Sequence, residues 1–260
     1  MTIFNISLPQ LQIFFLIFLR VGAIMMFIPI FDSRNIPVLF KAGLAFSVSI
    51  LLFSILKLDN IPFINSAIPF GIGVIGEIMM GAVIGLSVKL LFAGIQLAGQ
   101  LAGFQMGLAI ANVMDPVTSA QVSVIAQLNN LLAMLIFLTI NAHHMFLRAL
   151  AESFRLIPPF NVQFSNSLVE HLISISGNMF IIAIKVGSPV IVALLLTSAA
   201  FGLIARTVPQ MNVFLVAIPL KILVGLLFLA FALPYLLPFF RQIFNESGRD
   251  ILLLLRAMGN

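Results

Sequence analysis

The chain has 260 residues, of which 62% are hydrophobic and only 8% are charged, and it contains no cysteine. A chain this apolar cannot cover a soluble globule with polar surface, so its composition predicts an integral membrane protein without a soluble catalytic domain. The absence of cysteine excludes disulfides, thiolate nucleophiles and cysteine metal sites. The formal net charge of +5 is spread along the chain rather than gathered in a patch, which argues against nucleic acid as a partner.

Six apolar runs follow one another along the chain and are candidates for membrane-spanning helices, which need about 20 mostly apolar residues. Within each run apolar residues follow one another instead of alternating with polar residues, which favours an all-α fold over a β-barrel. We therefore predict a polytopic helical membrane protein of about six helices arranged as hairpins. The runs cover residues 8–31, 42–56, 71–107, 122–140, 172–201 and 213–240.

The first two runs have features that a plain spanning helix lacks. Arg20 and Pro29 interrupt the first run, and the second is short for a span. We expect the second run to tilt little, to rely on the flanking Lys41 and Lys57, or to avoid lipid on part of its surface.

The third run, residues 71–107, holds nine of the seventeen glycines. Glycine in a helix costs about 1 kcal/mol relative to alanine, so close packing must compensate for it. Gly99, Gly103 and Gly107 recur every four residues and leave one helical face almost without side chains. This face predicts close contact with a neighbouring helix or subunit.

Several polar residues lie inside the apolar runs, and we predict that they make buried polar or assembly contacts. A charged side chain at the centre of a lipid-exposed helix costs about 3 kcal/mol, so such residues should face protein or water. Glu77 and Lys89 lie about 120° apart on an ideal helix and are not expected to pair with each other. Snorkelling or solvation near a helix end is the alternative for those in the third run. The predicted contacts are at Glu77, Lys89, Gln96, Gln100, Lys185 and Lys221.

The helical pattern fails after Gly107, where Asn112 and then Asp115, directly before Pro116, disfavour a helix. Irregular backbone at membrane depth persists only where protein or a water-filled cavity surrounds it. We therefore predict a re-entrant or lumen-lining segment here. The alternative is an ordinary short loop at the membrane surface.

Two amphipathic segments complete the chain. Arg148, Glu152 and Arg155 have helical spacing in a segment that Pro158 and Pro159 should end. The part from Arg241 onward is expected to be helical and to lie at the membrane interface. The histidines at positions 143, 144 and 171 lack a metal-binding motif and are expected to be interfacial, with no metal and no cofactor.

Two stretches resemble the FliR family of flagellar export components, whose injectisome counterparts are called SctT. They are GQLAGFQMGLAIANVMDP, which begins at Gly99, and LLAMLIFLTINAHHMFLRALAESFRLIPP, which begins at Leu131. The resemblance implies a non-catalytic core subunit of the flagellar type III protein export gate. Such a subunit assembles with FliP and FliQ into the conduit for unfolded flagellar proteins across the bacterial inner membrane. It lies in the flagellar basal body, with FlhB and FlhA as further partners.

The resemblance also implies an internal division and a plug. Residues 1–170 would be FliP-like, and residues 171–260 would be a FliQ-like hairpin with a C-terminal amphipathic tail. The family's plug, which helps to close the export channel, corresponds by motif to residues 106–122. Simple packing is the alternative for its methionines. The implied plug residues are Met106, Gly107, Leu108, Ile110, Asn112, Val113, Met114, Asp115 and Pro116.

The main rival function is a small-solute or ion transporter, in which Glu77, Lys89 and Asp115 would form a polar site at mid-membrane. Such a transporter should show inverted internal repeats, and the sequence shows no convincing ones. An intramembrane protease ranks third, because no paired aspartates, HExxH motif or serine–histidine dyad lies in the apolar runs.

Overall fold

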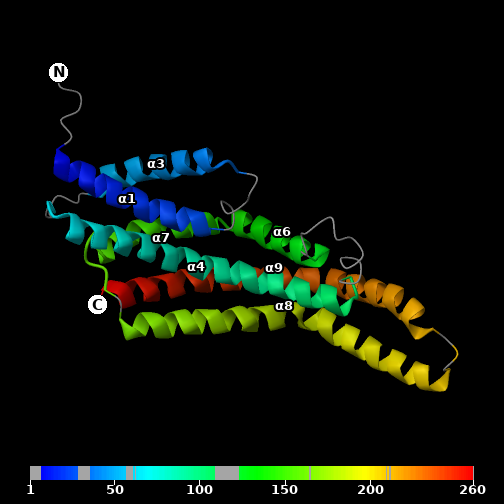
Figure 1. Ribbon diagram of the computed structural model, residues 1–260. Helices are drawn as coiled ribbons and strands as arrows, with labels where there is room; N and C mark the ends of the chain where they lie inside the picture. Colours follow the sequence, from blue (N-terminus) through cyan, green and yellow to red (C-terminus); the bar gives the residue numbers. More distant parts are fainter. Residues whose placement is uncertain are drawn as a thin grey trace. The chain divides into compact units, whose positions relative to one another are not determined.

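The computed structural model describes residues 7–28, 36–56, 61, 63–108, 123–163, 165–208, 210 and 212–259. These residues form α-helices without any strand, which confirms the predicted polytopic all-α class. Five of the helices are long and apolar enough to cross a membrane, and the number is six if α6 and α7 make up one broken span. The helices in chain order are α1 (Leu8–Phe27), α3 (Val38–Ile55), α4 (Ala67–Gln105), α6 (Val124–Thr139), α7 (Ala142–Leu156), α8 (Asn166–Thr207) and α9 (Val213–Gly259) (Figure 1).

Helix α3 starts earlier than the sequence predicts, directly after Pro37. Proline is tolerated at this end because the first N–H groups of a helix have no intrahelical partner. The helix therefore has 18 residues and is about 27 Å long, close to the thickness of a hydrocarbon core. The helix is therefore long enough to be a candidate span, and its predicted tilt and lipid exposure stay predictions.

Helices α8 and α9 continue through their prolines. Pro189 lies inside α8 and cannot donate a backbone hydrogen bond to the carbonyl of Lys185, four residues earlier. The hydroxyl of Ser188 donates to that carbonyl oxygen instead, at 3.1 Å. The side chain thus satisfies the acceptor that proline leaves open, and α8 extends over 42 residues.

The C-terminal part of the chain is a direct continuation of α9. Ile251, Leu254, Leu255 and Met258 recur at helical spacing and are fully buried. This apolar stripe packs inside the protein, and the position of the tail at the membrane interface stays a prediction. The tail is nevertheless helical, as predicted.

The chain packs as two compact units, and each is assembled from separate parts of the sequence. Unit 1 comprises Met1–Leu90, Asn141–Ser176 and Asn245–Asn260, and unit 2 comprises Leu91–Ile140 and Gly177–Phe244. Helices α4, α8 and α9 therefore each contribute to both units. The division at residue 170 into FliP-like and FliQ-like parts concerns likeness to two other proteins, and it stays a prediction.

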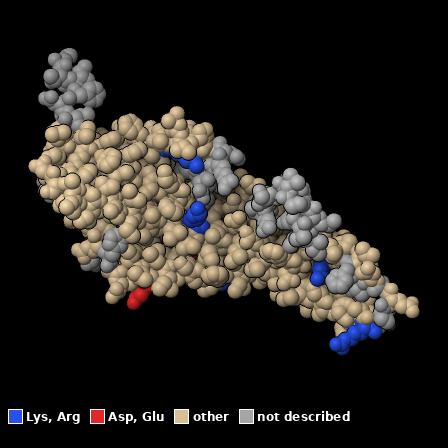
Figure 2. Space-filling view, in the orientation of Figure 1, with Lys and Arg blue, Asp and Glu red and all other residues tan. Residues whose placement is uncertain are grey.

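In unit 1, α3 lies beside α1 (Figure 1) and buries the stripe Ala45, Ser49 and Leu52. The ring of Phe14 on α1 meets Phe46 and Phe53 of α3 edge-on, with centroids 5.5 and 6.0 Å apart. In its most apolar window α3 is only 17% buried, which suits a helix that faces lipid or another subunit. Figure 2 shows correspondingly few charged side chains on the face it draws.

The centre of unit 2 contains three phenylalanines from three helices. Phe92 of α4, Phe137 of α6 and Phe244 of α9 lie with their ring centroids 5.3 to 5.6 Å apart. All three side chains are well buried, and their tilted and edge-on arrangement is the one that aromatic quadrupoles favour. These contacts fix the part of α4 that leads to its C-terminal end.

Candidate functional site

Glu77, predicted to make a buried polar contact, pairs with Arg20 of α1. The Nε–H of Arg20 donates to Oε2 of Glu77 at 2.5 Å, and Nη2 donates to Oε1 at 3.0 Å. Both side chains have no exposed surface. This two-pronged geometry is the strongest arrangement open to a guanidinium and a carboxylate.

The remaining hydrogen-bonding capacity of Arg20 is directed at α7 and the residue that follows it. Nη1 donates to the hydroxyl oxygen of Ser153 at 3.2 Å, and Nη2 donates to the carbonyl oxygen of Ile157 at 3.1 Å. The guanidinium carbon lies 4.0 Å from the ring centroid of Phe154. The pair therefore joins α1, α4 and α7 within unit 1 and leaves neither charge unbalanced.

Because Arg20 bonds both oxygens of Glu77, this carboxylate is not available for an ion or solute. The snorkelling alternative is wrong for Glu77, which is fully buried. Arg20 was seen in the sequence only as an interruption of an apolar run. The sequence does contain a signal for this pair. One apolar run holds a single positive residue, another holds a negative one, and a charge inside an apolar run needs a partner.

The other predicted polar contacts are less enclosed within the chain. The side chains of Lys89 and Lys185 are exposed on the single chain. Gln96, Gln100 and Lys221 are half-buried. The Lys89 ammonium lies 5.9 Å from the ring centroid of Phe27. Contacts of these residues with other subunits stay predictions.

The histidine pair after α6 packs ring against ring, with the centroids of His143 and His144 4.3 Å apart. In the part of the chain that the structure describes, no three histidine, aspartate or glutamate side chains come together as a candidate metal site. Glu152 and Arg155, on the exposed face of α7, form an ion pair at 3.7 Å.

The glycine face near the end of α4 contacts α6 within unit 2. A Cβ atom placed on Gly99 would lie 2.5 Å from the Cα of Ala126, so the two backbones touch directly. A Cβ on Gly103 would collide with the side chain of Ser123, the residue that precedes α6. The predicted close packing at Gly99 and Gly103 thus has a structural partner, and it is a helix of the same chain.

Gly107 has a different function from the other two glycines, because it ends the helix. Its φ is +82°, in the left-handed region that favours glycine. Its N–H donates to the carbonyl of Phe104 at 3.0 Å, and the N–H of Leu108 donates to the carbonyl of Gly103 at 3.1 Å. These two bonds form a Schellman motif, which satisfies carbonyls that the end of a helix otherwise leaves open.

Met106, next to this cap, is fully buried in the core of unit 2. It packs with Val190 and Leu194 of α8 and with Leu229 of α9. Gly225 of α9 carries no Cβ where the Met106 side chain lies. The first residue of the implied plug is therefore an anchor in the core.

The chain leaves α4 at Leu108 and returns at Ser123, and both residues contact Gly103. The segment between them starts and ends at the same turn of α4. Of the implied plug residues, only Met106, Gly107 and Leu108 are described. The other implied plug residues, Ile110, Asn112, Val113, Met114, Asp115 and Pro116, lie outside the described residues.

These features define a helical membrane protein whose central helix ends in a capped turn that holds both ends of one segment. Residues 11–247 match the family model described as bacterial export proteins, family 1. The chain belongs to this family and to its FliR branch, and it is therefore a component of the flagellar export apparatus.

The similarity to individual relatives extends over nearly the whole chain. The flagellar biosynthetic protein FliR of Bacillus subtilis (strain 168) is 36% identical over 247 residues, which are 93% of this chain and 95% of the relative. The protein of that name from Pectobacterium carotovorum subsp. carotovorum is 34% identical over 90% of this chain and 88% of its own length. The flagellar biosynthetic protein FliR of Escherichia coli (strain K12) is 29% identical over 92% of this chain and 91% of its own length.

Proposed function

We propose that this chain assembles with FliP-type and FliQ-type proteins in the bacterial inner membrane and forms part of the conduit for unfolded flagellar proteins. FlhA-type and FlhB-type proteins would be further partners. The apolar surface supports this assembly, because the most apolar window of α9 is only 22% buried within the chain. Such helices need lipid or partner helices around them.

In this proposal the chain acts without catalytic chemistry. Glu77 is the one buried carboxylate among the described residues, and Arg20 neutralises it. The transporter alternative needs an unpaired polar group at mid-membrane, and Glu77 does not provide one.

The segment 106–122 is the proposed closure of the conduit. The observation that carries this proposal is that Leu108 and Ser123 both contact Gly103, so the segment has one fixed base on α4. Apolar side chains such as Ile110, Val113 and Met114 would seal by excluding water, and such a seal parts without breaking strong bonds.

Deleting Ala109–Met114 in cells that produce the whole gate tests this closure. We expect the resting membrane to become permeable to ions and small molecules, because a passage for an unfolded chain is far wider than an ion. A matched variant that replaces Ala109–Met114 by serine and glycine keeps the length but removes the apolar seal, and it should leak as well. An assembled gate that stayed tight with both variants would exclude the segment from closure.

The assembly proposal is tested separately by copurification. The chain produced with its FliP and FliQ homologues should elute with them, and it should restore motility and export to cells that lack their own FliR. A chain that restores export but never copurifies with either partner would contradict the proposed complex.

A further inference from the structure

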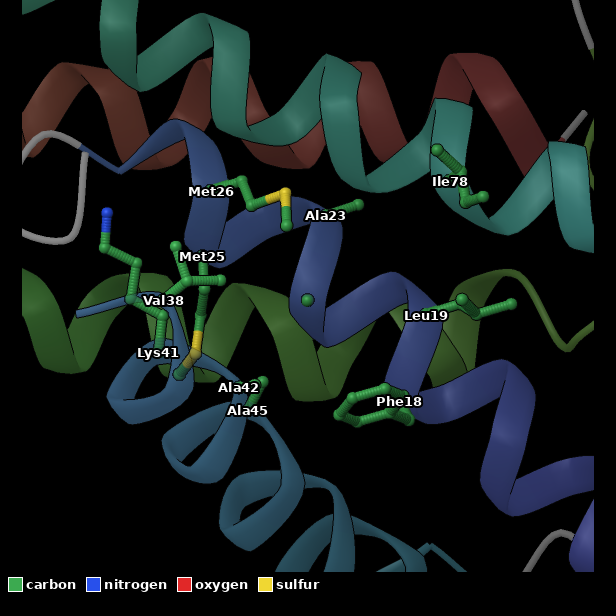
Figure 3. A pocket seen from close by; sticks show the side chains of 11 residues that line it. Phe18, Leu19, Ala23, Met25, Met26, Val38, Lys41, Ala42, Ala45 and Ile78 are labelled. Atoms are coloured by element: carbon green, nitrogen blue, oxygen red, sulfur yellow. The ribbon is translucent and has the colours of Figure 1, made fainter.

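A groove in unit 1 lies between the C-terminal half of α1 and the first turns of α3 and has a volume of about 520 Å³. It exists because the facing residues are small: Gly22 and Ala23 on α1, and Ala42 and Ala45 on α3. Further along the same seam the side chains become aromatic, and Phe18 meets Phe46 with ring centroids 6.3 Å apart. Phe18 thus lies at the aromatic end of the groove (Figure 3).

The groove has a polar end and an apolar end. Figure 3 shows Lys41 and Val38 at one end, with Phe18 and Leu19 at the other. Among the described residues that line the groove, Lys41 carries a charge. It is the fourth residue of α3, so it lies in the first turn, at the level of the membrane interface if α3 spans the bilayer.

We propose that this groove binds an anionic phospholipid, with an acyl chain along the small-residue seam and the headgroup phosphate at Lys41. An ammonium has three N–H donors, so it can bond a phosphate oxygen in addition to its contacts within the protein. The positive end of the α3 dipole lies at the same end of the groove and also favours an anion. Basic pockets between membrane helices bind anionic headgroups by this combination.

The walls suit a flexible chain of methylenes. Met26 is 66% exposed, and its unbranched thioether side chain can adapt to the occupant. Ile78 of α4, 43% exposed, lines another side. A volume of about 520 Å³ is within the range of small-molecule pockets. The proposal does not depend on the export function, because it follows from the groove and the position of Lys41.

Gly22 allows the groove to be filled without disturbing the fold. A Cβ on Gly22 would meet no atom within 4 Å, so Gly22→Leu extends into open space. Gly43 on α3 is also open but does not line the groove, which makes Gly43→Leu a matched control. We measure lipid retained by the purified full-length chain by native mass spectrometry, with phosphatidylglycerol and phosphatidylethanolamine of identical acyl chains added in turn.

The expected result is one phosphatidylglycerol retained per chain, lost in Gly22→Leu and kept in Gly43→Leu. Lys41→Gln should weaken phosphatidylglycerol binding about fivefold, because one basic residue near an anionic headgroup contributes about 1 kcal/mol to binding. The binding of phosphatidylethanolamine should stay unchanged. Lys41→Arg should retain the preference, and Arg148→Gln, which removes an exposed charge elsewhere, should not alter it. Unchanged lipid retention in Gly22→Leu, or equal loss of both lipids in Lys41→Gln, would overturn the proposal.

A helix of another protein is the competing occupant. In that case the complex copurified with FliP and FliQ homologues would retain no lipid at this site, and Gly22→Leu would reduce copurification while Gly43→Leu would not. That pair of results would assign the groove to a subunit contact and contradict lipid binding.

Discussion

Arg20 and Glu77 are 57 positions apart in the sequence, and each completes the charge balance of the other in the interior of unit 1. Through Ser153 and Ile157 the same guanidinium also holds α7. A buried pair contributes little net stability relative to apolar residues, but removing one partner leaves an uncompensated charge. The pair therefore links α1 and α4 to α7 within unit 1.

Removing one member of this pair should be far more harmful than removing both. We expect Glu77→Leu to destabilise the folded chain by about 3 to 5 kcal/mol, because Arg20 is then buried without a counter-charge. The double variant Arg20→Met with Glu77→Leu should recover most of that loss. Thermal unfolding of the purified chain in detergent, followed by far-ultraviolet circular dichroism, measures both. A double variant less stable than Glu77→Leu alone would contradict this account.

The backbone contact between α4 and α6 should tolerate no side chain. Gly99→Ala places a Cβ 2.5 Å from the Cα of Ala126, and we expect overpacking to cost about 1 to 3 kcal/mol. Gly103→Leu adds a larger side chain against Ser123 and should abolish assembly. Gly71→Ala and Gly71→Leu are the controls on the same helix, since a Cβ there meets nothing within 4 Å. Yield of the copurified complex is the measurement, and equal yields for Gly99→Ala and Gly71→Ala would refute the contact.

The left-handed residue at the end of α4 should accept asparagine better than alanine. Gly107 has a φ of +82°, where an alanine costs about 1 to 2 kcal/mol and an asparagine costs less. Gly107→Ala should therefore lower the unfolding temperature more than Gly107→Asn does. If the two variants unfold at the same temperature, the cap does not depend on this backbone conformation.

The packing of Met106 in the core of unit 2 should depend on the volume of the side chain rather than on its sulfur atom. Met106→Ala removes a fully buried side chain and should cost about 2 to 5 kcal/mol, whereas Met106→Leu should cost less than about 1.5 kcal/mol. We also expect Met106→Ala to increase ion leakage through the assembled gate, because the base of the proposed closure is loosened. Wild-type stability of Met106→Ala would show that this side chain does not hold the end of α4.

The apolar runs predict the helices well, because about 20 mostly apolar residues in a row are the condition for a membrane-spanning helix. The glycine spacing also predicts the close approach at Gly99 and Gly103. Partners depend on tertiary packing, so the pairing of Glu77 with Arg20 could not be derived from either run alone. The same limit applies to Gly107, which has the spacing of a packing residue but the φ of a helix cap. Lys89 and Lys185 are exposed on the single chain, so their predicted contacts depend on partners that the sequence of one chain does not contain.

Unit 1 contains the beginning, the middle and the end of the chain, which has a consequence for biosynthesis. The N–H of Gln163 donates to the carbonyl of Met258 at 3.0 Å, and the hydroxyl of Ser165 donates to that of Ala257 at 2.6 Å. Helix α1 is translated before the other helices of its unit, and the unit is completed only when residues 245–259 have been translated. Until then unit 1 exposes apolar surface to chaperones and membrane proteases. A messenger RNA truncated before the codon of Ile251 would therefore yield a chain for degradation rather than a shorter export component.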